Sequence, residues 1–287
     1  MLLVTGASGN VGSRLVRRLV EAGAPTRAFV RRPEAAAELQ ELGVETALGT
    51  FEDPESLRRA MSGVERVYVV SPPGVDVMAE QQLAVVSAAQ AEGVRHVVKQ
   101  SSITADEDSD ASIVVAHRRV EEAIEASGMS WTHLRPHWFM QNELGQAGTI
   151  TSDGVFYAPD VTEISMIDVA DVASAAARVL TSEGHEGKSY VLTGPEVVSY
   201  ADLAEAYSRV LGREVRWQEV SLDDARDSMR ESGLPEELAV GFTEIMGRYR
   251  AGGVTRKVSP AVEELTGRAP RTFEEFLREN RGVYEAA

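Results

Sequence analysis

The sequence predicts an α/β protein: a Rossmann-type, doubly wound parallel sheet with a small, mostly helical C-terminal lobe. Three observations lead to this prediction. The chain opens on a short apolar strand that runs straight into a glycine-rich turn and a helical stretch, TGASGNVGSRL. Strand and helix patterns then alternate through the first two-thirds of the chain, which is typical of a parallel sheet covered on both faces. From about Arg213 the alternation stops and helical patterns dominate.

The alternating elements are bounded by proline and glycine. Short apolar runs such as VYVV indicate strands buried on both faces. Strands are expected at 1–5, 25–30, 44–48, 65–70, 94–99, 131–135 and 188–193. Helices are expected at 10–23, 33–42, 54–62, 76–92, 112–127, 166–182 and 200–211. Proline at the first helical position (Pro33, Pro54) and glycine after the helix end (Gly43, Gly93, Gly128, Gly212) support these limits.

The chain length suits one large α/β domain with an attached lobe. We expect residues 1–135 and 164–195 to form the core, and residues 136–163 and 196–287 to form the smaller lobe, as one integrated unit. The lobe should hold a strand at 215–220, helices within 221–252 and a last helix near 271–281. Its expected place is over the carboxyl edge of the sheet, where open α/β sheets bind substrates.

Composition excludes several classes of function. The 29 basic residues against 45 acidic ones give a net charge of −16, which opposes binding to nucleic acid. The absence of cysteine excludes disulfides, thiol catalysis and cysteine-ligated zinc. No apolar run approaches the ~20 residues of a membrane helix. With a strand at the N-terminus, we expect no signal peptide, no membrane partner and a cytoplasmic location; both a monomer and a homodimer remain open.

The glycine-rich turn predicts a dinucleotide site. Gly6 permits the tight strand-to-helix turn, Gly9 lets a pyrophosphate approach the backbone, and Gly12 lets the helix pack close to the sheet. The helix N-terminus offers backbone N–H groups and a positive dipole end to phosphates. The cofactor residues expected here are Gly6, Ala7, Ser8, Gly9, Asn10, Val11 and Gly12. The alternative is a glycine-rich turn without a ligand.

The end of the second strand favours NADP(H) over NAD(H). An acidic residue there would hold the ribose 2′-hydroxyl, whereas arginine accommodates the 2′-phosphate. This strand ends in Arg31 and Arg32, and guanidinium groups suit a phosphate dianion. The alternative is that both arginines are merely solvated at a helix start. Thr50 and Phe51 after the third strand, and Ser71 and Pro72 after the fourth, should flank the adenine and run along the cofactor.

Six segments stand in an order that resembles a known family: TGASGNVG, AFVRRP, GTFEDPESL, RHVVKQSS, HLRPHWFMQN and MIDVADVA. Over roughly residues 1–280 the chain is similar to the atypical short-chain dehydrogenase/reductases of the NmrA-like type, near their NAD(P)H:quinone oxidoreductases. The resemblance implies a Rossmann core and NADP(H) binding. Some members reduce quinones, dyes or imines, and others are redox sensors without known turnover.

The chain departs from the short-chain dehydrogenases at their acid–base pair. None of its three lysines lies four residues after a tyrosine, so the Tyr-x-x-x-Lys pair is absent from the sequence. The resemblance instead places His117 where related reductases carry a catalytic lysine. It also places Ser101 at the position of the active-site serine, and Thr50 where an aspartate often meets the adenine amine. His117 could donate a proton to the acceptor; the alternative is a structural histidine. Lys99 could face a carboxylate.

Residues 136–142 gather aromatic and amide side chains after the sixth strand. We expect His137, Trp138, Phe139, Met140 and Asn142 to form the wall for a flat, conjugated small molecule. The alternative is that the aromatic rings pack in the core of the lobe. No metal-site spacing and no nucleophile elbow of the form G-x-S-x-G is found.

The leading hypothesis from these features is an NADPH-dependent reductase that passes hydride to a conjugated acceptor such as a quinone. Two alternatives stay open. One is an NADP(H)-sensing regulatory protein without turnover, which the missing Tyr–Lys pair favours. The other is a tailoring or imine reductase of secondary metabolism, which the same wall of side chains would serve.

Overall fold

We describe a computed structural model of the chain, which covers residues 1–72, 74, 76–106, 111–160, 163–250 and 257–285. The chain divides into two compact units. The first comprises Met1–Arg135 and Ala170–Val191, and the second comprises Pro136–Val169 and Leu192–Ala287. Each unit is described below by itself. Among the described residues, no helix combines the length and the apolar character needed to cross a membrane.

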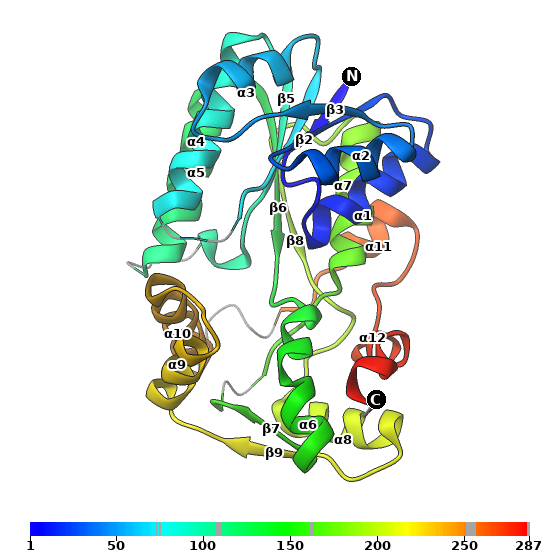
Figure 1. Cartoon of the computed structure of the whole chain (residues 1–287), viewed down its shortest axis with the longest axis vertical. Coiled ribbons are helices and arrows are strands. Elements are labelled where there is room, and N and C mark those ends of the chain that lie inside the picture. Colours follow the sequence, from blue (N-terminus) through cyan, green and yellow to red (C-terminus); the bar gives the residue numbers. More distant parts are fainter. Residues whose placement is uncertain (73, 75, 107–110, 161–162, 251–256, 286–287) are drawn as a thin grey trace. The chain divides into compact units, whose positions relative to one another are not determined.

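The first unit is built on a seven-stranded sheet with the order β3-β2-β1-β4-β5-β6-β8 (Figure 1). This order is that of the Rossmann fold, with the crossover between β1 and β4. The pairings β1–β2, β1–β4, β2–β3, β4–β5 and β5–β6 are all parallel. The strands are β1 (Leu2–Val4), β2 (Thr26–Val30), β3 (Glu45–Leu48), β4 (Arg66–Val69), β5 (His96–Gln100), β6 (Ser130–Pro136) and β8 (Lys188–Leu192).

Helices cover both faces of this sheet. They are α1 (Asn10–Glu21), α2 (Pro33–Glu41), α3 (Pro54–Met61), α4 (Asp76–Ala91), α5 (Ser112–Ala126) and α7 (Val169–Thr181), with a 3-10 turn η1 (Ile103–Asp106). Figure 1 shows α4 and α5 on one side of the sheet and α1, α2 and α7 on the other. A cluster of buried side chains from β1, β4 and β5 packs against α3, α4 and α5, and Leu3, Leu57, Val85 and Val97 within it have no exposed surface.

Proline marks the start of two helices, as the sequence predicts, and an aspartate caps one of them. Both α2 and α3 begin with proline, whose missing N–H costs nothing at that position. The Asp53 carboxylate caps α3 by accepting a hydrogen bond from the Glu55 amide at 3.1 Å. These caps fix where the chain leaves β2 and β3, and so they fix the two loops that follow those strands.

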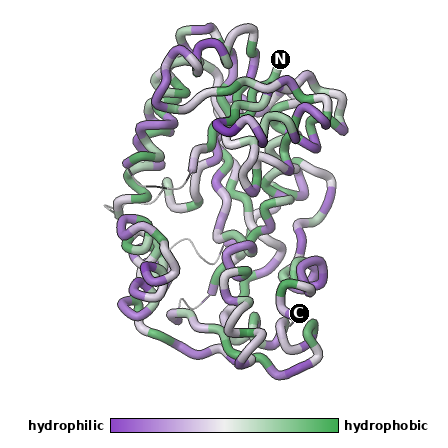
Figure 2. Tube along the Cα trace, in the orientation of Figure 1, coloured by the Kyte–Doolittle hydropathy of each residue, from purple (hydrophilic) through white to green (hydrophobic). Residues whose placement is uncertain are grey.

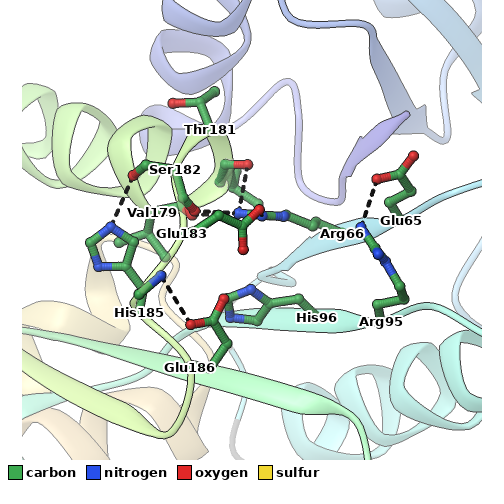
Figure 3. Close-up of polar contacts among 12 residues, drawn as sticks. Glu65, Arg66, Arg95, His96, Val179, Thr181, Ser182, Glu183, His185 and Glu186 are labelled. Atoms are coloured by element: carbon green, nitrogen blue, oxygen red, sulfur yellow. Dashed lines mark hydrogen bonds and ion pairs between the residues drawn. The ribbon is translucent and has the colours of Figure 1, made fainter.

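A buried arginine ties β4 to the end of α7. The Arg66 guanidinium donates to the carbonyl oxygens of Val179, Leu180 and Ser182 at 3.2, 3.2 and 2.5 Å, and it pairs with the Glu183 carboxylate (Figure 3). These carbonyls are left unpaired by the helix because it ends there. The arginine therefore satisfies groups whose burial would otherwise be costly.

The second unit is mostly helical around a small sheet. Strands β7 (Val155–Ala158) and β9 (Arg216–Glu219) pair in parallel. The helices are α6 (Ala147–Asp153), α8 (Tyr200–Leu211), α9 (Leu222–Glu231), α10 (Glu236–Arg250), α11 (Ala261–Thr266) and α12 (Phe273–Glu279), with 3-10 turns η2 (Met140–Gln146) and η4 (Arg281–Tyr284). Figure 2 shows hydrophobic and hydrophilic segments alternating along these helices, as amphipathic helices require.

Aromatic side chains form the core of the second unit. Tyr207 lies at its centre, with its ring centroid 5.5 Å from Phe156, 5.4 Å from Phe273 and 5.3 Å from Tyr284. The edge-on arrangement of the last two pairs is favourable beyond the area that they bury. The Tyr284 hydroxyl also donates to the Glu143 carbonyl oxygen at 3.3 Å. The end of the chain is thereby fastened to η2.

The α/β prediction for the core is confirmed, since the expected strands and helices are present. Five elements of the second unit were not expected from the sequence: η2, α6, β7, α11 and η4. Two of them are helices of 7 and 6 residues, too short to show a hydrophobic period.

Candidate functional site

The loop after β1 leaves no room for side chains at two of its glycines. Gly6 has φ +58°, and a Cβ on it would lie 2.7 Å from a methyl group of Val70. A Cβ on Gly12 would lie 2.1 Å from the Gly6 carbonyl oxygen, so only glycine fits there. Gly9 caps α1 from an extended conformation and supplies no side-chain cap. The first N–H groups of α1 therefore suit a phosphate group.

A pocket of about 140 Å³ opens beside this loop, within the first unit. It combines backbone of the glycine loop with the residues after β2 and β3. Its lining includes Gly6, Ser8, Phe29, Arg31, Arg32, Gly49, Thr50, Phe51, Glu52, Pro72 and Gln81. The structure thus brings seven of the expected cofactor residues to one pocket. These observations fit the adenosine side of a dinucleotide, with phosphates at the loop and the two arginines near the ribose.

The remaining expected cofactor residues lie elsewhere. Ala7 and Val11 are buried and are not among the residues that line the pocket. Asn10 is the first residue of α1, and its carbonyl oxygen accepts from Arg14 at 2.8 Å. The Ser71 hydroxyl accepts from the Gln82 amide at 3.3 Å. Ser101 belongs to a separate polar cluster, described below.

Glu52 is a pocket residue that the sequence analysis missed. Its carboxylate accepts from the Gln81 amide at 2.9 Å. That hydrogen bond, then a backbone hydrogen bond at Glu52 and, least of all, the Arg31 charge lower the pKa of Glu52, so the group is ionised at neutral pH. The carboxylate lies two residues after Thr50, where the resemblance indicates an aspartate for the adenine amine. A carboxylate four residues past the end of the third strand was the available signal.

The second feature of the first unit is a buried lysine–histidine pair. Lys99 in β5 is 0 % exposed, and its Nζ lies 3.0 Å from Nδ1 of His117 in α5. Lys99 also donates to the Gln100 carbonyl oxygen at 3.2 Å. Burial lowers the pKa of Lys99 to about 7, although the Glu121 carboxylate opposes the shift. The nearest partner of Lys99 is therefore His117. The Glu121 carboxylate acts on the lysine electrostatically.

His117 is held neutral by the same arrangement. Burial, followed by the Lys99 charge, lowers the pKa of His117 below its usual 6.5. The residue is half-buried, so part of it reaches the surface of the unit. When Lys99 donates to Nδ1, the ring proton must reside on Nε2. Lys99 thus selects the tautomer that presents an N–H donor on the far side of the ring.

The third part of this polar cluster is the ion pair between Arg135 and Glu121. Arg135 in β6 donates twice to the Glu121 carboxylate in α5, at 3.1 and 2.6 Å. Burial would raise the pKa of Glu121. The hydrogen bonds from Arg135, the charges nearby and the Ser101 hydroxyl outweigh this effect and lower the pKa. Ser101 is 5 % exposed and lies beside this pair. Glu121 therefore remains a charged group close enough to act on Lys99 electrostatically.

The same region brings three potential metal ligands together, which the sequence analysis did not expect. Ligand atoms of Glu121, Glu125 and His133 lie within 4.8 Å of one another. The two glutamates are one helical turn apart, and that spacing was the missed signal. Arg135 occupies the Glu121 carboxylate on two sides, and His133 Nε2 pairs with Glu125 at 3.1 Å. The group is thus satisfied by internal ion pairs.

The second unit holds its own pocket, of about 610 Å³. Its wall is aromatic and apolar with a few polar groups, as small-molecule sites are. The lining includes Trp138, Asn142, Glu143, Gln146, Tyr157, Tyr200, Asp224, Met229, Leu234, Phe242 and Met246. Trp138 packs edge-on against Phe242 with 5.9 Å between ring centroids. Trp138 and Asn142 are the two residues of the expected acceptor wall that line it.

The other three expected wall residues are placed away from this pocket. His137 is buried, its Nδ1 accepts from the Trp138 amide at 2.6 Å, and its ring lies 5.1 Å from Tyr249. Met140 is 2 % exposed and belongs to the core. Phe139 is half-buried and forms a β-bridge with Ile167. The sequence analysis missed the pocket residues from α8, α9 and α10, because nothing in the sequence pairs those helices with η2.

The chain is similar to known proteins over nearly its whole length. The model of the NmrA-like family matches residues 1–277. An NAD(P)H azoreductase of Xenophilus azovorans is 38% identical over 292 residues and is covered over its full length, as is this chain. The structure of the NADPH-dependent quinone oxidoreductase QOR2 of Escherichia coli, complexed with NADPH, has a TM-score of 0.88 and 30% identity, with 98% of this chain and 100% of that chain covered. The Citrobacter triphenylmethane reductase complexed with NADP(H) has a TM-score of 0.85 and 28% identity, with 97% and 99% covered.

Proposed function

Because the chain belongs to the NmrA-like family, we propose that it is an NADPH-dependent reductase that transfers hydride to a small conjugated acceptor, such as a quinone. One observation carries the proposal: the chain that holds the glycine loop and its arginine-lined pocket also holds a large aromatic pocket. A protein that only sensed the cofactor would have no use for a second pocket of about 610 Å³. The reductases named above act on molecules of this conjugated kind.

The cofactor would be held by the first unit. The amide groups at the start of α1 receive the pyrophosphate, because Gly6 and Gly12 keep side chains out of the loop. Arg31 and Arg32 bind the 2′-phosphate, and the Glu52 carboxylate accepts from the adenine amine. When bound, the nicotinamide supplies the hydride, so the protein provides orientation and charge.

His117 would supply the proton that a quinone or azo acceptor requires after it receives hydride. The Nε2–H group is the donor, because Lys99 occupies Nδ1. As the Nε2 proton leaves, the Lys99 ammonium passes a proton to Nδ1, so the imidazole stays neutral throughout; a pKa of about 7 leaves Lys99 part-protonated at neutral pH. The pair replaces the Tyr-x-x-x-Lys apparatus absent from the sequence.

The experiment is NADPH consumption by the purified protein with a panel of acceptors: quinones, azo dyes, and conjugated imines, each compared with NADH. NADPH-preferring turnover with any of these classes supports the proposal. Gly12→Ala, which places a Cβ against the Gly6 carbonyl, is the control for the cofactor site and should abolish turnover. Tight NADPH binding without turnover in the whole panel would favour the sensing alternative.

A further inference from the structure

The aromatic pocket of the second unit contains a buried acid. Glu143 in η2 is 4 % exposed and lines the pocket. The second acid of the lining, Asp224, is engaged in capping α9, where its carboxylate accepts from the Ser221 hydroxyl at 2.6 Å. The described residues that line the pocket include no lysine, arginine or histidine. The side chains that line the pocket therefore carry either a negative charge or no charge.

The Glu143 carboxyl has few partners for a buried acid. Trp138 Nε1 donates to its Oε1 at a long 3.4 Å, and no ion pair to it is found among the described residues. Burial raises the pKa of Glu143 to about 7, against the opposing effect of that hydrogen bond. A buried acid without a cation is costly to keep ionised, and a positive ligand would remove that cost.

The walls of the pocket are aromatic, and aromatic rings attract cations as the carboxylate does. Trp138, Tyr157, Tyr200 and Phe242 present aromatic rings to the pocket. The face of an aromatic ring attracts a cation, and the attraction grows when the cation is desolvated. A flat cation whose charge is spread over a conjugated system would meet these faces and the carboxylate together. A phosphate, sulfonate or carboxylate ligand would find no positive group among the described lining residues and two acids, Glu143 and Asp224, to repel it.

We propose that this pocket takes a flat conjugated cation, such as an aromatic iminium, whose positive charge pairs with the Glu143 carboxylate. The proposal rests on the proposed reductase function and narrows its acceptor class. Such a cation is reduced by hydride alone: the C–H bond at C4 of the nicotinamide breaks, and both electrons form a C–H bond at the acceptor carbon. The acceptor becomes neutral, the cofactor gains the positive charge, and no proton is needed. The neutral product no longer pairs with Glu143, which favours its release.

Three fluorescent tricyclic probes of similar size and different charge test the proposal in the absence of NADPH. They are N-methylacridinium (cation), 9-methylanthracene (neutral) and anthracene-9-carboxylate (anion). We expect the cation to bind the wild-type protein at least about tenfold more tightly than the anion, because the buried carboxylate attracts the one and repels the other. This comparison needs no variant, so it stands even where a substitution disturbs folding. Equal affinity for cation and anion would overturn the proposal.

Glu143→Gln tests the carboxylate itself, because glutamine keeps the shape and still accepts from Trp138 Nε1. We expect about a tenfold loss of affinity for N-methylacridinium, and no change beyond twofold for 9-methylanthracene. Glu237→Gln is the matched control: it removes one exposed negative charge from α10 of the same unit, outside the pocket lining. An equal loss for both probes, or an equal loss in both variants, would refute the pairing.

Binding and turnover separate this proposal from the proposed function. Charge-selective binding without NADPH consumption would retain the Glu143 assignment and reject the reductase. If the protein consumes NADPH with quinones but binds the three probes with equal affinity, the proposed reductase function stands and the proposed cation pocket is rejected. N-methylacridinium serves in both assays, because it accepts hydride at its central ring carbon.

Discussion

The Nζ atom of Lys99 lies 3.0 Å from Nδ1 of His117, with the lysine fully buried in β5 and the histidine half-buried in α5. The pair has two consequences. A protonated Lys99 can only donate to Nδ1, so the proton of the neutral imidazole then lies on Nε2, and the pair also places a second titratable group beside that ring. Both groups have lowered pKa values, chiefly because of burial.

The first prediction concerns acceptors that need a proton. His117→Ala should lower kcat for a quinone or azo dye about 10²-fold, the usual effect of losing a general acid. Reduction of N-methylacridinium, which needs hydride alone, should change by less than about twofold. Steady-state kinetics with both acceptors measures the difference, and the distant His185→Gln is the matched control. Equal losses for both acceptors would show that His117 positions the cofactor or supports the fold.

The second prediction concerns the stability of the folded chain at alkaline pH. The pKa of Lys99 is about 7 when folded and 10.5 when exposed, so the unfolded chain binds more protons between these values. The free energy of unfolding should therefore rise with pH from about 7 upward, by at most about 4 kcal/mol from this one group. Urea unfolding at pH 7, 8 and 9 should show the rise in the wild type and in Lys188→Met, an exposed lysine, and lose it in Lys99→Met. The same slope in all three proteins would contradict a buried, shifted Lys99.

The third prediction concerns cofactor choice. Replacing Arg31 and Arg32 with alanine should weaken NADPH binding about tenfold or more and leave NADH binding within about twofold, because only NADPH carries the 2′-phosphate. Arg17→Ala removes an exposed positive charge from α1, outside the pocket lining, and should change neither affinity. Fluorescence titration with both cofactors measures this. An equal loss for NADPH and NADH in the double variant would refute the phosphate assignment.

The fourth prediction concerns the glycine loop. Gly12→Ala should abolish NADPH binding and lower the free energy of unfolding, because its Cβ would lie 2.1 Å from a backbone carbonyl oxygen that cannot move aside. Gly9→Ala is milder, since its Cβ would lie 3.2 Å from the same oxygen. A thermal unfolding series with parallel NADPH titration compares the two. Gly12→Ala with normal affinity would mean that the loop does not hold the phosphates.

The core of the fold could be predicted from the sequence because its signals are local. The run from Leu2 to Gly12 encodes strand, turn and helix within one segment, and Pro33 and Pro54 mark helix starts. The second unit could be predicted only in outline. Its two-stranded sheet joins β7 to β9 across some sixty residues, and no local pattern reveals such a pairing.

The candidate sites could likewise be predicted from the sequence only in part. Residues that follow strand ends, such as Arg31 and Thr50, were predicted because parallel strands end at one edge. Lys99 and His117 meet from β5 and α5, and only the packing of helix on strand reveals that meeting. The burial of Glu143 in a 3-10 turn also depends on α8, α9 and α10, which lie far away in the sequence. Its chemistry therefore had no signal in the sequence.

The most direct test of the proposed reductase is the rate of NADPH consumption with a quinone, measured with ordinary NADPH and with NADPH deuterated at the transferred C4 position. The account predicts NADPH-preferring turnover that slows on deuteration and disappears in Gly12→Ala. Tight NADPH binding with no consumption, by the wild-type protein and with every acceptor class tried, would contradict it.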